Sequence, residues 1–396
     1  MRILQIIDSF QPELGYQETF LARELQRLGH QVIVITGNRP AWSVRHPAYL
    51  PGLPGKSLGD YPVGRRFEDG LDVIRLPARF QIAGRLWLCG LEKAVRELEA
   101  DAVHAHVFVT LTSLRLVLLK LLRRLPARLV IDDHMYPSVS RRSLRCLYPL
   151  IKMVYSPLAR CAADSIAAVS PTTLQFMIEH YGLRREDTLV IPLAADTGLF
   201  RFDAQARTEI RNSLSISLDA FVIIYTGKLV VYKQVHILVD AFLHLAQQYA
   251  NVFLMLVGFW DEAYVESIKQ RITTTPGAER VRWLPGVPNR DLYRYFSAAD
   301  VAVWPAEHTI SILEAMACGL PVIVSDEPRA ADELGHGNGI VFAKGNVSEL
   351  ACALESLIND RHKAREMGQR GLQAVHEHYT WETVAEQFLQ LYGASG

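Results

Sequence analysis

The chain has 396 residues, 42 basic and 42 acidic side chains, 49% hydrophobic residues and 21% charged residues. This length predicts two or three domains, with two favoured, and the apolar content excludes a disordered chain. The zero net charge argues against a general nucleic-acid-binding protein, so we expect no nucleic acid partner. The five cysteines are scattered without a Cys-x-x-Cys pair. They indicate reduced thiols in a cytoplasmic protein, and neither a disulfide framework nor a zinc site.

Predicted strands alternate with predicted helices, such as 16–28, 234–249 and 312–318, along the whole chain. The predicted strands span residues 2–7, 31–36, 72–76, 101–105, 128–131, 164–169, 187–191, 221–226, 252–257, 281–284, 300–304, 321–325 and 339–342. Several of them are apolar at consecutive positions, as expected of parallel strands buried on both faces. They are too many for one sheet. The sequence therefore predicts an α/β protein with two doubly wound parallel-sheet domains.

The domain boundary is expected within residues 192–220, which contain Pro192 and no strong strand pattern. Residues 38–70 are rich in proline and glycine and predict a long loop. Because the chain begins directly with a strand pattern, we expect no signal peptide. The longest apolar stretch, 111–125, is interrupted by basic residues and is too short to cross a bilayer as a helix.

Basic residues are concentrated in residues 115–160, where ten lysines and arginines stand against only Asp132 and Asp133. Leucines and isoleucine are interleaved with them. Two interpretations stay open for this stretch. It forms either amphipathic helices with solvated basic faces or a surface that rests on anionic lipid headgroups.

Open parallel sheets bind ligands beyond the carboxyl ends of their strands, so two facing sheets would make an interdomain cleft lined by loops. The first such loop carries Gly15 just before a predicted helix. It lacks the G-x-G-x-x-G dinucleotide motif, and the chain lacks a phosphate-loop motif. Gly15 either lets backbone N–H groups reach an anion or is only a turn glycine.

Two lysines follow the predicted strand 221–226. Gly227 ends this strand, and Lys228 and Lys233 follow it five residues apart. Paired cations at the carboxyl edge of a sheet suit a diphosphate, whose negative charge must be neutralised as it leaves. The alternative is a pair of solvated loop lysines.

A third candidate region follows the predicted strand 300–304. Glu307 lies on the loop, and a helix begins at Ser311. Ser311 and Glu314 match a capping box, which would explain Glu314 structurally. A carboxylate at a strand end, such as Glu307, can accept hydrogen bonds from sugar hydroxyls. The helix start, at Ser311 and Ile312, offers N–H groups to an anion.

Histidines and aspartates close two further predicted strands. His104 and His106 end one strand, and Asp132, Asp133 and His134 end the next. We expect His104 and His106 to point to opposite faces of their strand, which disfavours a shared metal ion, and we favour His106 as the residue that meets a ligand. A metal held by His106, His134 and one aspartate is the disfavoured alternative. The prediction is therefore no metal site.

Taken in order, these segments resemble the family 4 retaining glycosyltransferases, which have the GT-B fold of two Rossmann-like domains facing across a cleft. The resemblance covers nearly the whole chain. Its most specific motif is Leu313-Glu-Ala-Met-Ala-Cys-Gly-Leu-Pro321. Weaker motifs occur in the family's order at residues 14–18, 101–106, 167–170 and 191–196, and at Gly227-Lys-Leu with Lys233.

The resemblance implies a retaining, metal-independent hexosyltransferase that uses a nucleotide-diphosphate sugar, a hydroxyl acceptor and no cofactor. The implied donor-binding residues are Gly15, Lys228, Lys233, Ser311, Ile312 and Glu314, and the implied catalytic residues are His106, Lys228, Lys233 and Glu307. The lysines would stabilise the diphosphate as leaving group, and Glu314 would hold the ribose hydroxyls. His106 would contact the transferred sugar, and Glu307 would hold sugar hydroxyls.

The resemblance also implies an acceptor-side domain over residues 1–197 and a nucleotide-sugar-binding domain over 198–378, with a helix in 379–396 that packs back onto the first domain. Two features depart from the family pattern. A lysine stands at 228 where the family usually has arginine, and one residue fewer separates Glu307 from Glu314. Either Glu307 or Ala306 therefore occupies the position of the family's first glutamate.

The basic stretch and the resemblance together predict a lipid-linked or cell-envelope glycan precursor as acceptor. The protein would then be cytoplasmic and would rest on the inner face of the cell membrane through residues 115–160. Two other functions compete with this one. The chain could be a catalytically weak binding or scaffold protein, or a nucleotide-sugar epimerase that needs no acceptor.

Overall fold

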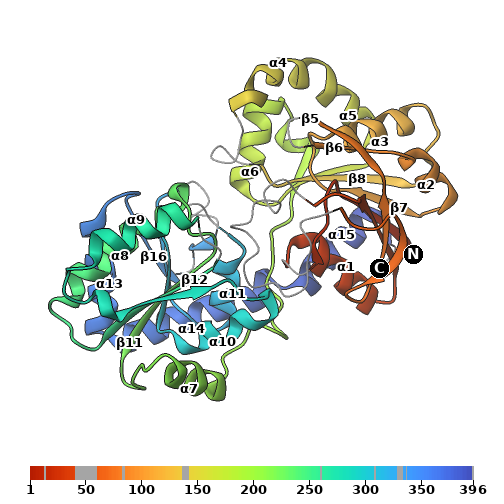
Figure 1. Cartoon of the computed structure of the whole chain (residues 1–396). Helices are drawn as coiled ribbons and strands as arrows, with labels where there is room; N and C mark the ends of the chain where they lie inside the picture. Colours follow the sequence, from red (N-terminus) through yellow and green to blue (C-terminus); the bar gives the residue numbers. More distant parts are fainter. Residues whose placement is uncertain are drawn as a thin grey trace. The chain divides into compact units, whose positions relative to one another are not determined.

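The computed structural model describes residues 1–12, 15–40, 60–82, 85–135, 142–258, 261–306, 309–327, 333–335 and 337–394. They form two compact units. Of the described residues, the first unit contains 1–40, 60–193 and 381–394, and the second contains 194–380. Each unit is built on one large sheet with helices on its faces (Figure 1). The prediction of two Rossmann-like parallel-sheet domains is therefore confirmed.

The sheet of the first unit has eight strands in the order β10-β9-β8-β7-β1-β2-β4-β3. All neighbours are parallel except β3 and β4, which are antiparallel. Its strands are β1 (Arg2–Ile6), β2 (Gln31–Gly37), β3 (Gly64–Glu68), β4 (Leu71–Leu76), β7 (Ala102–Ala105), β8 (Arg128–Asp133), β9 (Ser165–Ala168) and β10 (Thr188–Val190). A separate antiparallel pair joins β5 (Ala78–Ile82) to β6 (Arg85–Leu88).

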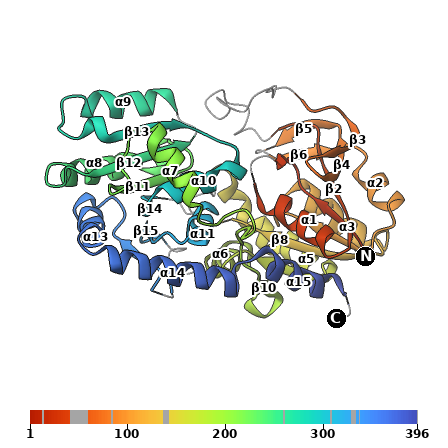
Figure 2. The same cartoon turned by 90° about the horizontal axis from the view of Figure 1, so that it is seen from below.

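The helices of the first unit are α1 (Gln17–Arg27), α2 (Leu91–Glu97), α3 (Leu111–Leu121), α4 (Tyr148–Leu150), α5 (Ser156–Ala162), α6 (Pro171–Phe176) and α15 (Trp381–Tyr392). Short 3-10 or π-helical turns lie at Arg142–Leu147, Ile151–Tyr155, Met177–Tyr181 and Arg185–Asp187. The last helix, α15, packs beside α1 (Figure 2). Between the two helices, the rings of Phe20 and Trp381 stack with centroids 5.6 Å apart. The two ends of the chain thus build the same face of this unit.

The sheet of the second unit has six parallel strands in the order β13-β12-β11-β14-β15-β16. Its strands are β11 (Phe221–Thr226), β12 (Val252–Gly258), β13 (Val281–Pro285), β14 (Val301–Trp304), β15 (Val322–Ser325) and β16 (Gly339–Phe342). Its helices are α7 (Ala204–Ser213), α8 (Val235–Ala246), α9 (Glu262–Ile272), α10 (Leu292–Ala298), α11 (Ser311–Ala317), α13 (Val347–Asn359) and α14 (Arg361–His378). Short 3-10 turns lie at Val231–Lys233, Ala278–Arg280 and Asn289–Asp291. Every side chain of β11 is buried, as the continuous apolar run predicts.

Each predicted strand overlaps an observed one, but three observed strands, β3, β5 and β6, were not predicted. The prediction of a loop over the whole of 38–70 is wrong at its end, because residues 64–68 form β3 at the edge of the sheet. This strand reads Gly-Arg-Arg-Phe-Glu and buries none of its side chains fully, so it lacks the apolar pattern that reveals a strand. Residues 41–59 of the predicted loop lie outside the described residues.

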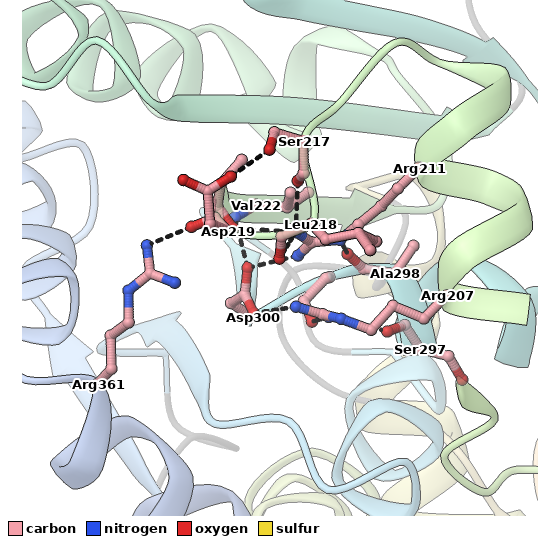
Figure 3. Close-up of polar contacts among 12 residues, drawn as sticks. Arg207, Arg211, Ser217, Leu218, Asp219, Val222, Ser297, Ala298, Asp300 and Arg361 are labelled. Carbon is pink, nitrogen blue, oxygen red and sulfur yellow. Dashed lines mark hydrogen bonds and ion pairs between the residues drawn. The ribbon is translucent and has the colours of Figure 1, made fainter. Parts of the chain in front are cut away.

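A partly buried ion-pair cluster holds the start of β11 in the second unit (Figure 3). One oxygen of Asp300 accepts a hydrogen bond from Arg207 at 2.8 Å, and the other accepts from Arg211 at 2.7 Å and from the Val222 N–H at 2.7 Å. The Arg211 guanidinium is fully buried and also donates to the carbonyl oxygens of four residues, Ser217, Leu218, Ala220 and Ala298. Asp300 therefore supplies the counter-charge for a cation that has no access to water.

We expect Asp300→Ala to lower the free energy of unfolding by about 3–5 kcal/mol, because it leaves the Arg211 charge buried and uncompensated. Urea denaturation followed by far-ultraviolet circular dichroism would measure this. The matched control is Glu209→Ala, which breaks an exposed ion pair of 2.7 Å with Arg294 and should cost less than about 1 kcal/mol. Equal losses for the two variants would contradict the assignment.

Candidate functional site

Each sheet has a place where the chain reverses the direction in which it adds strands. In the first unit β1 lies between β2 and β7, and in the second β11 lies between β12 and β14. Loops that leave two such neighbouring strands run to opposite faces, which opens a crevice at the carboxyl ends of the strands where ligands bind in doubly wound sheets. The candidate residues follow these strands: Gly15 follows β1, His106 follows β7, Lys228 follows β11, and Ser311 and Glu314 follow β14.

The turn after β11 brings its backbone close to β12. Gly227 has a positive φ of 137°, and a Cβ atom at Gly258 would lie 1.6 Å from the Gly227 carbonyl oxygen, so only glycine fits at 258. The Tyr225 hydroxyl donates to the Lys228 carbonyl oxygen at 2.8 Å. Lys228 and Lys233 are both half-buried at this edge. The sequence prediction of two lysines beyond β11 is consistent with their positions, and their roles remain predictions.

Glu314 is a buried carboxylate on α11, beside the end of β14. Its Oε1 accepts a hydrogen bond of 2.7 Å from the Asn289 side chain, and its Oε2 has no partner among the described residues. Burial raises the pKa of Glu314 to about 7, while hydrogen bonds from Asn289 and Ser311 oppose this rise. A buried carboxylate with one vacant acceptor atom is suited to receive hydroxyl donors from a ligand.

The predicted capping box at Ser311 and Glu314 is wrong. The N-cap of α11 is Ile310, whose side chain makes no capping hydrogen bond, and Ser311 is already the first helical residue. The N–H of Ile312 donates to the Thr309 carbonyl oxygen at 3.1 Å, and that of Ser311 lies 3.4 Å from the Thr309 hydroxyl. Glu314 therefore belongs to no capping box, although its carboxyl group lies in the first turn of α11, where a negative charge favours the start of a helix. Glu307 lies outside the described residues, and Ala306 is fully buried.

In the first unit, Gly15 has a positive φ of 65° and directly precedes Tyr16, the N-cap of α1, whose side chain makes no capping hydrogen bond. The Gly15 N–H lies 3.4 Å from the Pro12 carbonyl oxygen. The first turn of α1 brings Gln17 and Glu18, both buried, to the neighbouring strands. This helix start therefore stands beside the histidine cluster at the ends of β7 and β8.

The centre of that cluster is the buried carboxylate of Asp132. Its Oδ2 lies 3.1 Å from His106 Nδ1, 3.3 Å from His104 Nε2, 3.4 Å from His134 Nε2 and 3.1 Å from the Gln17 amide nitrogen. Although burial opposes ionisation, these histidines hold the pKa of Asp132 well below its usual value. Burial, reinforced by His106, lowers the pKa of His104 to about 4, so its ring is neutral at pH 7.

The expectation that His104 and His106 point to opposite faces is wrong. Their ring centroids lie 4.2 Å apart, and both rings contact the same oxygen of Asp132. Side chains alternate along a strand with a period of two, so residues two positions apart share a face. His104, His106 and Asp132 also place one candidate ligand atom each within 4.8 Å of one another, so a metal ion could be held there.

The backbone next to His106 is strained. Val107 has a φ of 77°, which is a rare conformation for a β-branched residue and costs on the order of 1–3 kcal/mol. Two side chains hold it in place. Asp132 Oδ1 accepts from the Val107 N–H at 3.2 Å, and the Ser113 hydroxyl donates to the Val107 carbonyl oxygen at 2.7 Å. Asp132 thus fixes both the His106 ring and the chain direction beside it.

Sequence reasoning did not identify the partners of these residues. Asn289 lies just before α10 and donates to Glu314 on α11. Gln17 and Tyr392 reach Asp132 and His104 from helices at opposite ends of the chain. No local motif marks any of the three. The sequence marks Asp132 only as a possible metal ligand, although the two-residue period of β7 and β8 places it on the face of both histidines.

Two family models match the chain in succession. The model for glycosyltransferase family 4 matches residues 19–199, and that for glycosyl transferases group 1 matches residues 206–374. A D-inositol 3-phosphate glycosyltransferase of Geodermatophilus obscurus is 24% identical and covers 97% of this chain and 85% of its own. A GDP-mannose-dependent phosphatidylinositol monomannoside mannosyltransferase of Mycobacterium tuberculosis is 28% identical over 49% of this chain and 53% of its own.

Two solved structures share the fold over almost all of the chain. The Anabaena protein HepE in complex with UDP superposes with a TM-score of 0.76 at 22% identity, with both chains fully covered. Sucrose-phosphate synthase from Thermosynechococcus elongatus gives 0.72 at 21% identity, with 99% of this chain and 98% of that chain covered. The fold and the two successive family matches show that this chain belongs to the family 4 glycosyltransferases of the GT-B fold.

Proposed function

We propose that the protein is a retaining, metal-independent hexosyltransferase that uses a nucleotide-diphosphate sugar and a hydroxyl acceptor. The observation that carries this proposal is the set of charges beyond two neighbouring strands of the second unit. Lys228 and Lys233 follow β11, and Glu314, with its vacant oxygen, follows β14. Two cations suit a diphosphate and a buried carboxylate suits a pair of ribose hydroxyls, which is the polar outline of a nucleoside diphosphate.

In this proposal the acceptor hydroxyl attacks the anomeric carbon while the bond from that carbon to the diphosphate oxygen breaks. The acceptor proton passes to the leaving phosphate, and attack from the same face retains the configuration. Lys228 and Lys233 neutralise the charge that develops on the diphosphate. Gly15 and the start of α11 add N–H groups to the diphosphate, His106 contacts the transferred sugar, and Glu307 holds sugar hydroxyls.

The relatives support a nucleotide-sugar donor without identifying its base. Similar proteins include one named as GDP-mannose-dependent and one whose structure contains UDP and glucose. One is named for a phosphatidylinositol acceptor and another for inositol phosphate. We therefore keep uridine, guanosine and adenosine donors open, and we propose a lipid-linked or cell-envelope glycan precursor as acceptor.

The structure divides the basic stretch 115–160 into paired and unpaired charges. Arg115, Lys120 and Arg160 form ion pairs with Glu92, Asp164 and Asp187. Arg123, Arg124, Arg145 and Lys152 are exposed and form no ion pair with the described residues. Near two of these cations, Leu147, Leu150, Met153 and Val154 are 44%, 59%, 78% and 49% exposed. Leu150 stands three positions from both Leu147 and Met153 and four from Val154, so these side chains lie near one another on a helical run.

We propose that this basic apolar surface, formed by Arg145, Leu147, Leu150, Lys152, Met153 and Val154, rests on the anionic cytoplasmic leaflet of the cell membrane. Among the described residues, no helix is both long and apolar enough to cross a bilayer. Cations near the headgroups and apolar side chains at the acyl boundary would together bind the surface of the membrane. Binding to the membrane surface would bring the first unit close to a lipid-linked acceptor.

The proposed donor site predicts that one of UDP, GDP and ADP raises the melting temperature of the protein, and that EDTA does not change this shift. Lys228→Ala and Lys233→Ala should each reduce the rate with the matching sugar donor by about 10²-fold or more. Each substitution removes a positive charge that neutralises the leaving diphosphate. Lys269→Ala, on the surface helix α9, is the matched control and should retain activity. No shift with any nucleotide at millimolar concentration would refute the donor site.

Glu314→Gln should have opposite effects on binding and on stability. Nucleoside diphosphate affinity should fall about tenfold or more, because a charged acceptor of hydroxyl groups is lost. The folded pKa of Glu314, about 7, lies above its ordinary value of 4.5, so its stability contribution is present below pH 4.5 and is lost as the pH rises through 7. The ligand-free variant should therefore gain melting temperature over the wild type between pH 5 and pH 8. If the melting temperatures of the variant and the wild type differed by the same amount at every pH, the raised pKa of Glu314 would be contradicted.

The membrane proposal predicts that the protein floats with vesicles of phosphatidylcholine and phosphatidylglycerol, but not with phosphatidylcholine alone. Leu150→Glu and Met153→Glu should each abolish flotation, because a carboxylate opposes both apolar insertion and the anionic headgroups. Phe67→Glu is the matched control, since Phe67 is 76% exposed on β3 of the same unit. Flotation that is independent of lipid charge, or equally lost in Phe67→Glu, would remove this part of the proposal.

A further inference from the structure

A row of buried polar groups connects α15 to His106 in the first unit. The Tyr392 hydroxyl lies 2.7 Å from His104 Nδ1, and His104 Nε2 lies 3.3 Å from Asp132 Oδ2. The same oxygen lies 3.1 Å from His106 Nδ1. His104 Nε2 meets this oxygen only at the ion-pair distance of 3.3 Å, without a hydrogen bond of good geometry. His106 Nε2 has no hydrogen-bond partner among the described residues. The row therefore begins at Tyr392 on α15 and ends at a buried ring nitrogen whose hydrogen-bonding capacity is unused.

We propose that Tyr392 is a positioning residue, whose hydroxyl acts through His104 and Asp132 to hold the His106 ring with Nε2 presented to the substrate. This inference rests on the proposed function only in assigning His106 to the transferred sugar. No motif of the sequence includes Tyr392, which lies 288 positions from His104.

The protons along the row can be assigned from the groups themselves. A tyrosine hydroxyl that donates to His104 Nδ1 leaves the single proton of the neutral ring on Nε2, where it faces the Asp132 carboxylate. Asp132 remains ionised and accepts from His106 Nδ1–H. With its proton on Nδ1, the His106 ring carries a lone pair on Nε2, which can accept a hydrogen bond from a sugar hydroxyl. Removing the tyrosine hydroxyl frees His104 to place its proton on either nitrogen and weakens the hold on Asp132.

The packing of α15 keeps the Tyr392 hydroxyl beside His104. Phe388, one turn before Tyr392, stacks on its ring and contacts the His104 ring at a centroid distance of 4.7 Å. Arg27 pairs with Glu382 at 2.7 Å, and Arg128 donates to the Leu391 carbonyl oxygen at 3.0 Å. Contacts at both ends of α15 thus limit its sliding along the sheet, so the hydroxyl meets His104 in a defined geometry.

A metal ion is the competing explanation for His104, His106 and Asp132. The hydrogen-bonded arrangement accounts for more of the observed contacts, because Asp132 Oδ2 also lies 3.1 Å from the Gln17 amide nitrogen, which can only donate. Metal binding would require both facing ring nitrogens to lose their protons and that amide to move. The donors around this oxygen are those of a satisfied buried anion.

The test compares Tyr392→Phe with Tyr155→Phe. Tyr155 lies in the same unit, and its buried hydroxyl also makes a bond of 2.7 Å, but to the Phe108 carbonyl oxygen instead of a histidine ring. In nitrogen-15 spectra of the ligand-free protein, the wild type should show a single Nε2–H tautomer for His104. Tyr392→Phe should show a mixed tautomer and a shifted His106 resonance, whereas Tyr155→Phe should leave both unchanged.

In kinetics with the matching donor, Tyr392→Phe should lower kcat about tenfold, the value of roughly one hydrogen bond, with little change in the donor KM. Tyr155→Phe should change kcat less than this at matched stability. Unchanged histidine resonances in Tyr392→Phe, or equal kcat losses in both variants, would overturn the proposal. So would a stoichiometric metal found by mass spectrometry and lost in His104→Ala. The spectra need no substrate, so they decide the proposal even if no sugar is transferred.

Discussion

The reversal of strand order in each sheet is the constraint on which both candidate sites depend. A parallel strand can be followed only by a crossover, and two crossovers that leave neighbouring strands on opposite faces leave the strand ends uncovered. β1 beside β7 and β11 beside β14 are these places. The positions of His106 and Lys228 therefore follow from topology as much as from their local sequence.

The two buried carboxylates at these places, Asp132 and Glu314, differ in pKa because different numbers of hydrogen-bond donors and cations surround them. Asp132 is ringed by histidines, an amide and the Val107 N–H, and its pKa lies well below the usual value. Glu314 has Asn289 and Ser311, so burial dominates and raises its pKa to about 7. The first is a permanent anion that fixes its neighbours, including the strained Val107. The second leaves an acceptor atom unused, which a ligand would satisfy.

The strands that are buried on both faces can be predicted from the sequence, but the exposed edge strand and the short separate pair cannot. Runs such as Val32-Ile-Val-Ile35 and the apolar stretch of β11 reveal themselves, because strands buried on both faces must be apolar throughout. The exposed edge strand β3 and the short pair β5–β6 carry no such signal. In the sites, motifs locate the residues that follow strand ends. They do not locate Asn289, Gln17 or Tyr392, whose relevance exists only after the chain has folded.

Helix α15 completes the first unit by covering the face on which His104 lies. The sheet and α1 of this unit are formed by residues before 194, but the face that buries His104 is closed by Phe388 and Tyr392. Without α15, the His104 ring would be exposed to water, and the burial that keeps it neutral would be lost. A charged His104 would then compete with His106 for the Asp132 carboxylate. The arrangement at His106 thus depends on a segment separated from it by the entire second unit, and local sequence around the histidine motif cannot specify it alone.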